Sequence, residues 1–121
     1  MPTTSGHTTA IRASRVIGTP VKDQEGHTLG KIEDVILDKT DNAVMFAVVG
    51  FGGFLGAGEK FHPLPWSALD FDEEQDAYVV PFSKPELEAA PADTIKELTK
   101  GDGQQSRDKA FTYYKVEPYW N

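Results

Sequence analysis

The stretch AVMFAVV at residues 43–49 is apolar at every position, and it decides the fold class. A strand with one face in the core and the other in water alternates apolar and polar residues, whereas this stretch shows no alternation. It therefore predicts a β-strand that is buried on both faces. We expect the aromatic end of the chain, a helix or a second subunit to cover its outer face.

Further short strands are expected around this one, at residues 18–21, 27–38, 60–64, 68–71 and 77–80. The first two are separated by DQEG at residues 23–26, where the glycine can take the positive φ of a turn. The last two are joined by the acidic stretch DEEQD at residues 72–76. Six short strands within about 70 residues indicate a small barrel, so the predicted fold class is mainly β.

Helix signals replace strand signals after Phe82. Residues 83–86, SKPE, have the capping-box pattern, in which a serine and a glutamate each accept a hydrogen bond from the other's backbone. Residues 94–97, TIKE, repeat that pattern. The sequence therefore predicts two short helices, followed by a loop at residues 101–105.

The end of the chain, FTYYKVEPYW at residues 111–120, holds five of the thirteen aromatic residues. Tyr119 and Trp120 either pack on the outer face of the 43–49 strand or dock into a second subunit or another protein. Both are therefore candidate interaction residues. Residues 83–121 are expected to form a helical, aromatic-rich C-terminal extension that packs on the barrel or on a second subunit.

The length of 121 residues is that of one domain, and the charge balance excludes several classes of function. With 12 basic and 19 acidic residues the net charge is −7, which repels nucleic-acid backbones and anionic lipids. No apolar run approaches the roughly 20 residues of a membrane-spanning helix. Residues 1–13 are polar, without the apolar stretch of a signal peptide, so we expect a disordered start and a cytoplasmic location.

A set of motifs occurs in the same order as in one known family. The set consists of SRVIG at residues 14–18, Val21, GHTLGKIED at residues 26–34, FGGFLG at residues 51–56 and Pro65-Trp66. Over residues 14–82 the chain resembles the PRC-barrel family. The resemblance implies a six-stranded, partly open β-barrel, as in the cytoplasmic domain of the photosynthetic reaction-centre H subunit and the carboxy-terminal domain of a ribosome maturation factor. Those members are binding and assembly modules, not enzymes in themselves. Residues 83–121 are similar to the extensions of free-standing bacterial PRC-barrel proteins.

The glycine-rich stretch at residues 50–60 suggests a phosphate-binding loop but does not match the template. A P-loop needs Gly-Lys-Ser or Gly-Lys-Thr leading into a helix, whereas Lys60 follows a glutamate and precedes a phenylalanine. We therefore interpret the stretch as a sharp connection between two strands. Its large apolar residues either fold back on the barrel or contact another chain, which makes candidates of Phe51, Phe54 and Leu55.

The chain has no cysteine, and its histidines lack the spacing of a metal site. His27 and His62 could still meet in space with Glu33, Asp34 or Asp38, because ligands in a barrel converge from distant strands. The acidic turn before the last strand lacks the central glycine and terminal glutamate of a calcium loop. No Gly-x-Ser-x-Gly motif is present. We therefore expect no metal, no cofactor and no catalytic residue.

Two classes of function remain open from the sequence. The first is a non-catalytic protein-binding or assembly module that acts as a homodimer and binds a partner at a membrane-associated or ribosomal assembly. The alternative is a small-ligand or anion-binding barrel with its site at the glycine loop or a subunit interface. A barrel of six short strands is filled by its own side chains, so a small-molecule site must lie at a rim or an interface.

Overall fold

The computed structural model describes residues 10–51 and 60–120, which form one sheet with helices after it and a single short helix before it. The strands are β1 (Pro20–Lys22), β2 (Thr28–Asp38), β3 (Ala43–Phe51), β4 (His62–Leu64), β5 (Asp70–Asp72) and β6 (Ala77–Val79). The α-helices are α1 (Ala13–Val16), α2 (Lys84–Glu88), α3 (Ile95–Leu98) and α4 (Gln104–Tyr114). Two 3₁₀ turns complete the described elements, η1 (Trp66–Ala68) and η2 (Lys100–Gly103).

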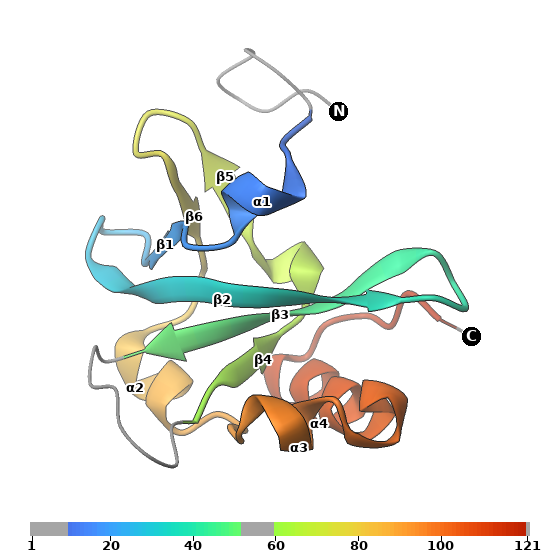
Figure 1. Ribbon diagram of the computed structural model, residues 1–121. Coiled ribbons are helices and arrows are strands. Elements are labelled where there is room, and N and C mark those ends of the chain that lie inside the picture. The colour runs from blue at the N-terminus through green and yellow to red at the C-terminus, as the bar shows by residue number, and fades with distance from the viewer. Residues whose placement is uncertain (1–9, 52–59, 121) are drawn as a thin grey trace.

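The six strands lie in the order β4-β3-β2-β1-β6-β5, so the sheet ends at β4 on one side and at β5 on the other and does not close. Strands β1 and β6 pair in parallel, and the remaining neighbours pair antiparallel. Figure 1 shows the long β2–β3 pair crossing the centre, α3 and α4 below it, and α1 beside β5 above it. The mainly β, partly open barrel with a short helical C-terminal extension is confirmed.

Gly30 is required because the backbones of β2 and β3 approach each other closely at this position. Gly30 of β2 pairs with Phe51 of β3. A Cβ atom added at Gly30 would lie 1.8 Å from the carbonyl oxygen of Gly50, far inside van der Waals contact. Strands β2 and β3 can therefore approach this closely only with glycine at position 30.

Strand β3 is buried on both faces, as its unbroken apolar sequence predicts. Residues 45 to 49 are each 5% exposed or less. Ala47 and Val49 belong to the main core, whereas Phe46 and Val48 form a second cluster with Leu98 of α3. The outer cover therefore includes Leu98 of α3, a helix of the extension.

The strand bounds differ from expectation at several ends. The strand expected at residues 68–71 begins later, at Asp70, because η1 takes up residues 66–68. Before the first strand lies a helix that the sequence analysis did not predict: α1 occupies Ala13–Val16, with Val16 buried in the core. The expected disordered segment, residues 1–13, lies outside the described residues up to position 9.

The extension begins with the predicted capping box. The backbone N–H of Ser83 donates to Glu86 Oε1 at 2.9 Å, and the N–H of Glu86 donates to Ser83 Oγ at 3.3 Å. The loop predicted at residues 101–105 is present at residues 101–103, where Gly101, Asp102 and Gly103 have positive φ values of 59°, 63° and 74°, but α4 already begins at Gln104. Residues 107, 110, 111 and 114 of α4 are buried, which is the spacing of one helix face. The first four residues of the aromatic stretch, 111–114, belong to this helix. None of the helices within residues 10–51 and 60–120 has the length and apolar content that crossing a bilayer requires.

Candidate functional site

The apolar residues of the glycine-rich connection lie only partly in the described structure. Phe51 ends β3, is half-buried against the main core, and has its ring centroid 5.0 Å from that of His62. Phe54 and Leu55 fall within residues 52–59, outside the described residues. Phe51 therefore already has packing partners in its own chain, at the end of β3.

Tyr119 joins the end of the chain to the β2–β3 turn. Its hydroxyl donates a hydrogen bond of 2.6 Å to Oδ2 of Asp38, the last residue of β2. The other oxygen of Asp38 accepts from the backbone N–H groups of Thr40 and Asp41, at 2.9 and 3.1 Å. The bond from Tyr119, together with these backbone bonds, lowers the pKa of Asp38 against the opposing effect of burial.

Trp120 and Arg107 form a second contact of the same segment. The Arg107 guanidinium lies 3.6 Å from the Trp120 ring centroid, and its Nη1 lies 3.9 Å from Asp38 Oδ2. Phe111 of α4 contacts both tail rings edge-on, Tyr119 at 5.9 Å and Trp120 at 4.8 Å between centroids. We call Asp38, Arg107, Tyr119 and Trp120 the tail cluster. It holds the tail against α4 and the end of β2.

Sequence reasoning singled out Tyr119 and Trp120 but not their polar partners. Asp38 and Arg107 are only 7% and 8% exposed. Burying a charged group is costly unless an opposite charge or hydrogen bonds compensate it, so the two groups stabilise each other. A usable signal existed for Asp38, because an aspartate directly before the KTDN turn suits capping of that turn. Arg107 carries no such signal, since its burial depends on α4 packing against the sheet.

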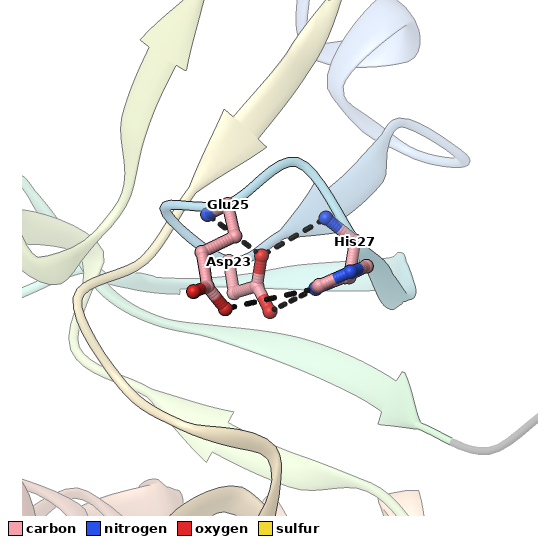
Figure 2. Close-up of side chains that lie close together, drawn as sticks. All are labelled: Asp23, Glu25 and His27. Atoms are coloured by element: carbon pink, nitrogen blue, oxygen red, sulfur yellow. Dashed lines mark hydrogen bonds and ion pairs between the residues drawn. The ribbon is translucent and has the colours of Figure 1, made fainter.

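His27 lies in the β1–β2 turn with Asp23 and Glu25, as Figure 2 shows. The backbone N–H groups of Glu25 and His27 each donate to Asp23 Oδ1 at 2.9 Å. His27 Nδ1 lies 3.1 Å from Asp23 Oδ2 and 3.8 Å from Glu25 Oε1. Burial acts to raise the pKa of Asp23, and the hydrogen bonds from His27 and Glu25 outweigh it, so the pKa is lowered.

The donor set of this turn is that of a possible metal site, because one imidazole and two carboxylates offer atoms within 4.8 Å of one another. The turn itself already uses these atoms. Asp23 caps the turn with one oxygen and meets the imidazole with the other, which is the ordinary role of an aspartate at this position. The structure groups His27 with Asp23 and Glu25, and not with Glu33, Asp34 or Asp38 as the sequence allowed.

His62 lies apart from this turn, in the edge strand β4. Its Nδ1 is 3.1 Å from the carbonyl oxygen of Pro91, and since a carbonyl only accepts, Nδ1 carries the proton. Burial lowers the pKa of His62, while the bond to Pro91 opposes the shift. The neutral imidazole therefore ties β4 to the segment between α2 and α3.

An open groove of about 270 Å³ lies between α1 and the β5–β6 hairpin. We call it the α1 groove. Its lining residues are Ile11, Ser14, Arg15, Ile17, Gly18, Thr19, Pro20, Phe71 and Asp76. Ile11 and Ile17 are 45% and 41% exposed, unusually high for large aliphatic side chains on one short segment. Sequence analysis did not single these residues out, because only the fold brings the segment beside Phe71.

Comparison with known proteins gives one match to a family. The family model of the PRC-barrel domain matches residues 8–87, which runs from just before α1 into α2. No curated protein matches the chain. The matched region contains all six strands and the α1 groove, whereas α3, α4 and the tail cluster residues Arg107, Tyr119 and Trp120 lie beyond it.

Proposed function

The chain belongs to the PRC-barrel domain family, and from that membership we propose that it is a non-catalytic module that binds another protein in the cytoplasm and acts as a homodimer. The partner would belong to a membrane-associated or ribosomal assembly, where related barrels serve as binding modules. Family membership supports only the fold of such a module. Support for protein binding has to come from the exposed residues of this chain.

The observation that carries this proposal is the contrast between a filled interior and an incompletely covered surface. Val21, Ile32 and Val49, on three neighbouring strands, are each 0% exposed. Side chains therefore occupy the space that a small molecule would need inside the sheet. Ile11 and Ile17, in contrast, leave more than a third of their surface in water. Apolar surface at a groove on the outside favours a protein partner over a small ligand.

The non-catalytic part of the proposal is supported by the contacts of His62, Tyr119 and Asp38, three groups with shifted pKa values. His62 binds a backbone carbonyl, and Tyr119 binds Asp38, whose remaining oxygen caps a turn. These bonds hold elements of the fold together. A catalytic acid or base would instead face a cleft in which substrate could reach it.

The homodimer interface is proposed at Phe51, Phe54 or Leu55 of the glycine-rich connection, or at Tyr119 and Trp120. Light scattering at tens of micromolar tests the dimer, and a monomer at that concentration contradicts it. Phe54→Asp places a charge in the proposed contact and should shift a dimer toward monomer. A dimer unaffected by Phe54→Asp removes the connection from the interface.

Protein binding is tested by affinity capture from the source cell with the full chain as bait. A partner retained in stoichiometric amounts, and still retained from purified components, supports the module. Absence of any such partner, combined with saturable binding of a small metabolite, contradicts it. Capture is then repeated with the Phe54→Asp and Ile17→Ser variants as baits. Loss of the partner with only one of them shows whether the glycine-rich connection or the α1 groove binds it.

A further inference from the structure

The α1 groove joins apolar and charged surface in one place. Its apolar side comes from Ile11 and Ile17, which flank α1, and from Phe71 of β5, which is half-buried against the core. Phe71 is held in place by an edge contact with Tyr78, with ring centroids 5.1 Å apart. The groove therefore has apolar lining on both sides, from Phe71 on the hairpin and from the two isoleucines on the α1 segment.

The hairpin wall of the groove is strongly acidic. Residues 70–76, DFDEEQD, carry five carboxylates and no lysine or arginine. Asp76 lines the groove itself, and Asp70 is exposed on the edge strand β5. The β1–β2 turn lies beside this hairpin, since a Cβ atom added at Gly26 would lie 3.6 Å from Gln75 Oε1. Asp23 and Glu25 of that turn add two more carboxylates to the same end of the molecule.

Arg12 and Arg15 of the α1 segment and Lys22 of β1, whose charge helps to lower the pKa of Asp72, offset only part of this charge. Five carboxylates of the hairpin against these three basic groups leave a net charge of −2, before the carboxylates of the β1–β2 turn are counted. An occupant with apolar side chains would shield Ile11 and Ile17 from water. An occupant with positive charge would be attracted to the hairpin carboxylates.

We propose that the α1 groove binds a positively charged segment of a partner protein, with an apolar side chain of that segment seated on Ile11, Ile17 and Phe71 and its lysines or arginines facing the β5–β6 hairpin. This inference rests on the proposed protein-binding function and names the chemistry of the partner. The segment is short, because the groove of about 270 Å³ accommodates only one or two large side chains.

Charge disfavours the other occupants of this groove. A second copy of the chain would bring its own hairpin, so two such faces would meet with ten carboxylates and six basic groups, a net charge of −4. Nucleic acids and anionic lipid surfaces carry negative charge and are repelled for the same reason. A basic protein segment is attracted by the same field.

The test uses the full chain and a short labelled peptide in which leucines alternate with lysines, followed by fluorescence anisotropy. Two control peptides replace either the leucines by serine or the lysines by glutamate. The leucine–lysine peptide should bind most tightly, and its binding should weaken steeply at roughly 1 M salt, where the screening length falls to about 3 Å. Tighter binding of the glutamate peptide overturns the proposal, as does equal binding of the serine peptide.

Two matched pairs of variants locate the site. Ile17→Ser should weaken binding about tenfold, whereas Ile95→Ser, an equally exposed isoleucine at 37% on α3, should leave it unchanged. Asp76→Asn should weaken binding several-fold, whereas Asp102→Asn should not. Asp76 and Asp102 both have positive φ, 52° and 63°, which asparagine tolerates, so the two substitutions are alike in strain as well as in charge. Ile11→Ser serves as a second groove variant, and circular dichroism confirms that each variant is folded.

If the two variants of each pair weakened binding equally, the peptide would not be bound at the α1 groove in particular, and the proposal would be wrong. Loss of a homodimer on Ile17→Ser, measured by light scattering, would make the occupant a second copy and would also overturn it. A chain that remains dimeric and captures a partner irrespective of Ile17→Ser contradicts the groove assignment alone. The proposed function would stand in that case, because its own tests do not depend on this groove.

Discussion

The hydroxyl of Tyr119 donates a hydrogen bond of 2.6 Å to Oδ2 of Asp38, across 81 positions of sequence. This bond connects the tail beyond α4 to the end of β2. Asp38 is also the acceptor that shapes the β2–β3 turn, so one carboxylate serves both the turn and the tail. Removing the Tyr119 hydroxyl therefore measures how much this link between barrel and extension contributes to stability.

Tyr119→Phe should lower the melting temperature by a few degrees, because it leaves a buried carboxylate without one of its donors. Tyr113→Phe is a matched control. Tyr113 is 37% exposed against 36% for Tyr119, and its hydroxyl also donates one bond, at 2.7 Å, to the backbone carbonyl of Glu86. The loss should be smaller for Tyr113→Phe, because its acceptor is uncharged. Equal losses in calorimetry would contradict a special role for Asp38.

The same contact predicts a change of stability at alkaline pH. Burial, then the bond to Asp38, raises the pKa of Tyr119 to about 12. The folded chain keeps this proton to higher pH than the unfolded chain does, so its stabilising effect is complete below the unfolded pKa of about 10. That stabilisation is lost as pH rises from about 10 to about 12. Urea unfolding across this range should show a smaller decline for Tyr119→Phe than for the wild type. Tyr78 and Tyr114, whose pKa values are also raised by burial, contribute equally to both proteins.

Deleting residues 111–121 should lower the free energy of unfolding by several kcal/mol. The deletion removes Phe111 and Tyr114, which are buried, and each large side chain contributes roughly 1.5 to 3 kcal/mol. A shorter deletion that begins at Pro118 removes the tail rings but keeps α4, so it should cost less. An unchanged melting temperature after the longer deletion would contradict a packed extension.

Gly30→Ala should be among the most damaging single substitutions, with a loss of about 3 kcal/mol or more. Its added methyl group would meet the Gly50 carbonyl oxygen at 1.8 Å, which forces β2 and β3 apart. Gly50→Ala is the matched comparison, since its new Cβ would meet the flexible end of Glu33 at 3.1 Å. Chemical denaturation should therefore rank Gly30→Ala well below Gly50→Ala. The reverse order would refute the close approach.

Zinc should leave the melting temperature unchanged, because Asp23 already uses both carboxylate oxygens within its turn. Asp23→Ala should lower stability in the absence of any metal, by removing the cap of the β1–β2 turn. The opposite pattern, a rise in melting temperature with zinc that His27→Ala abolishes, would establish a metal site. Thermal shift with and without a chelator distinguishes the two.

Features set by neighbouring residues could be predicted from the sequence alone. The apolar run at residues 43–49 predicted a strand covered on both faces, and residues 45 to 49 are all buried. Ser83 and Glu86 predicted a capping box that the structure contains. Gly26 was predicted to turn the chain with a positive φ, and it has φ of 89°. Each of these depends on residues close in sequence, whose dihedral angles and hydrogen bonds local chemistry decides.

Contacts between these elements were decided by the tertiary structure alone. Helix α4 begins at Gln104, inside the loop predicted at residues 101–105, where Gly103 packs so close to β3 that a Cβ atom there would lie 3.1 Å from Met45 Sδ. The burial of Arg107 beside Asp38 and the position of Ile17 beside Phe71 likewise arise from packing. Residues far apart in sequence meet only after the sheet and helices assemble, and no periodicity along the chain records which of them will become neighbours.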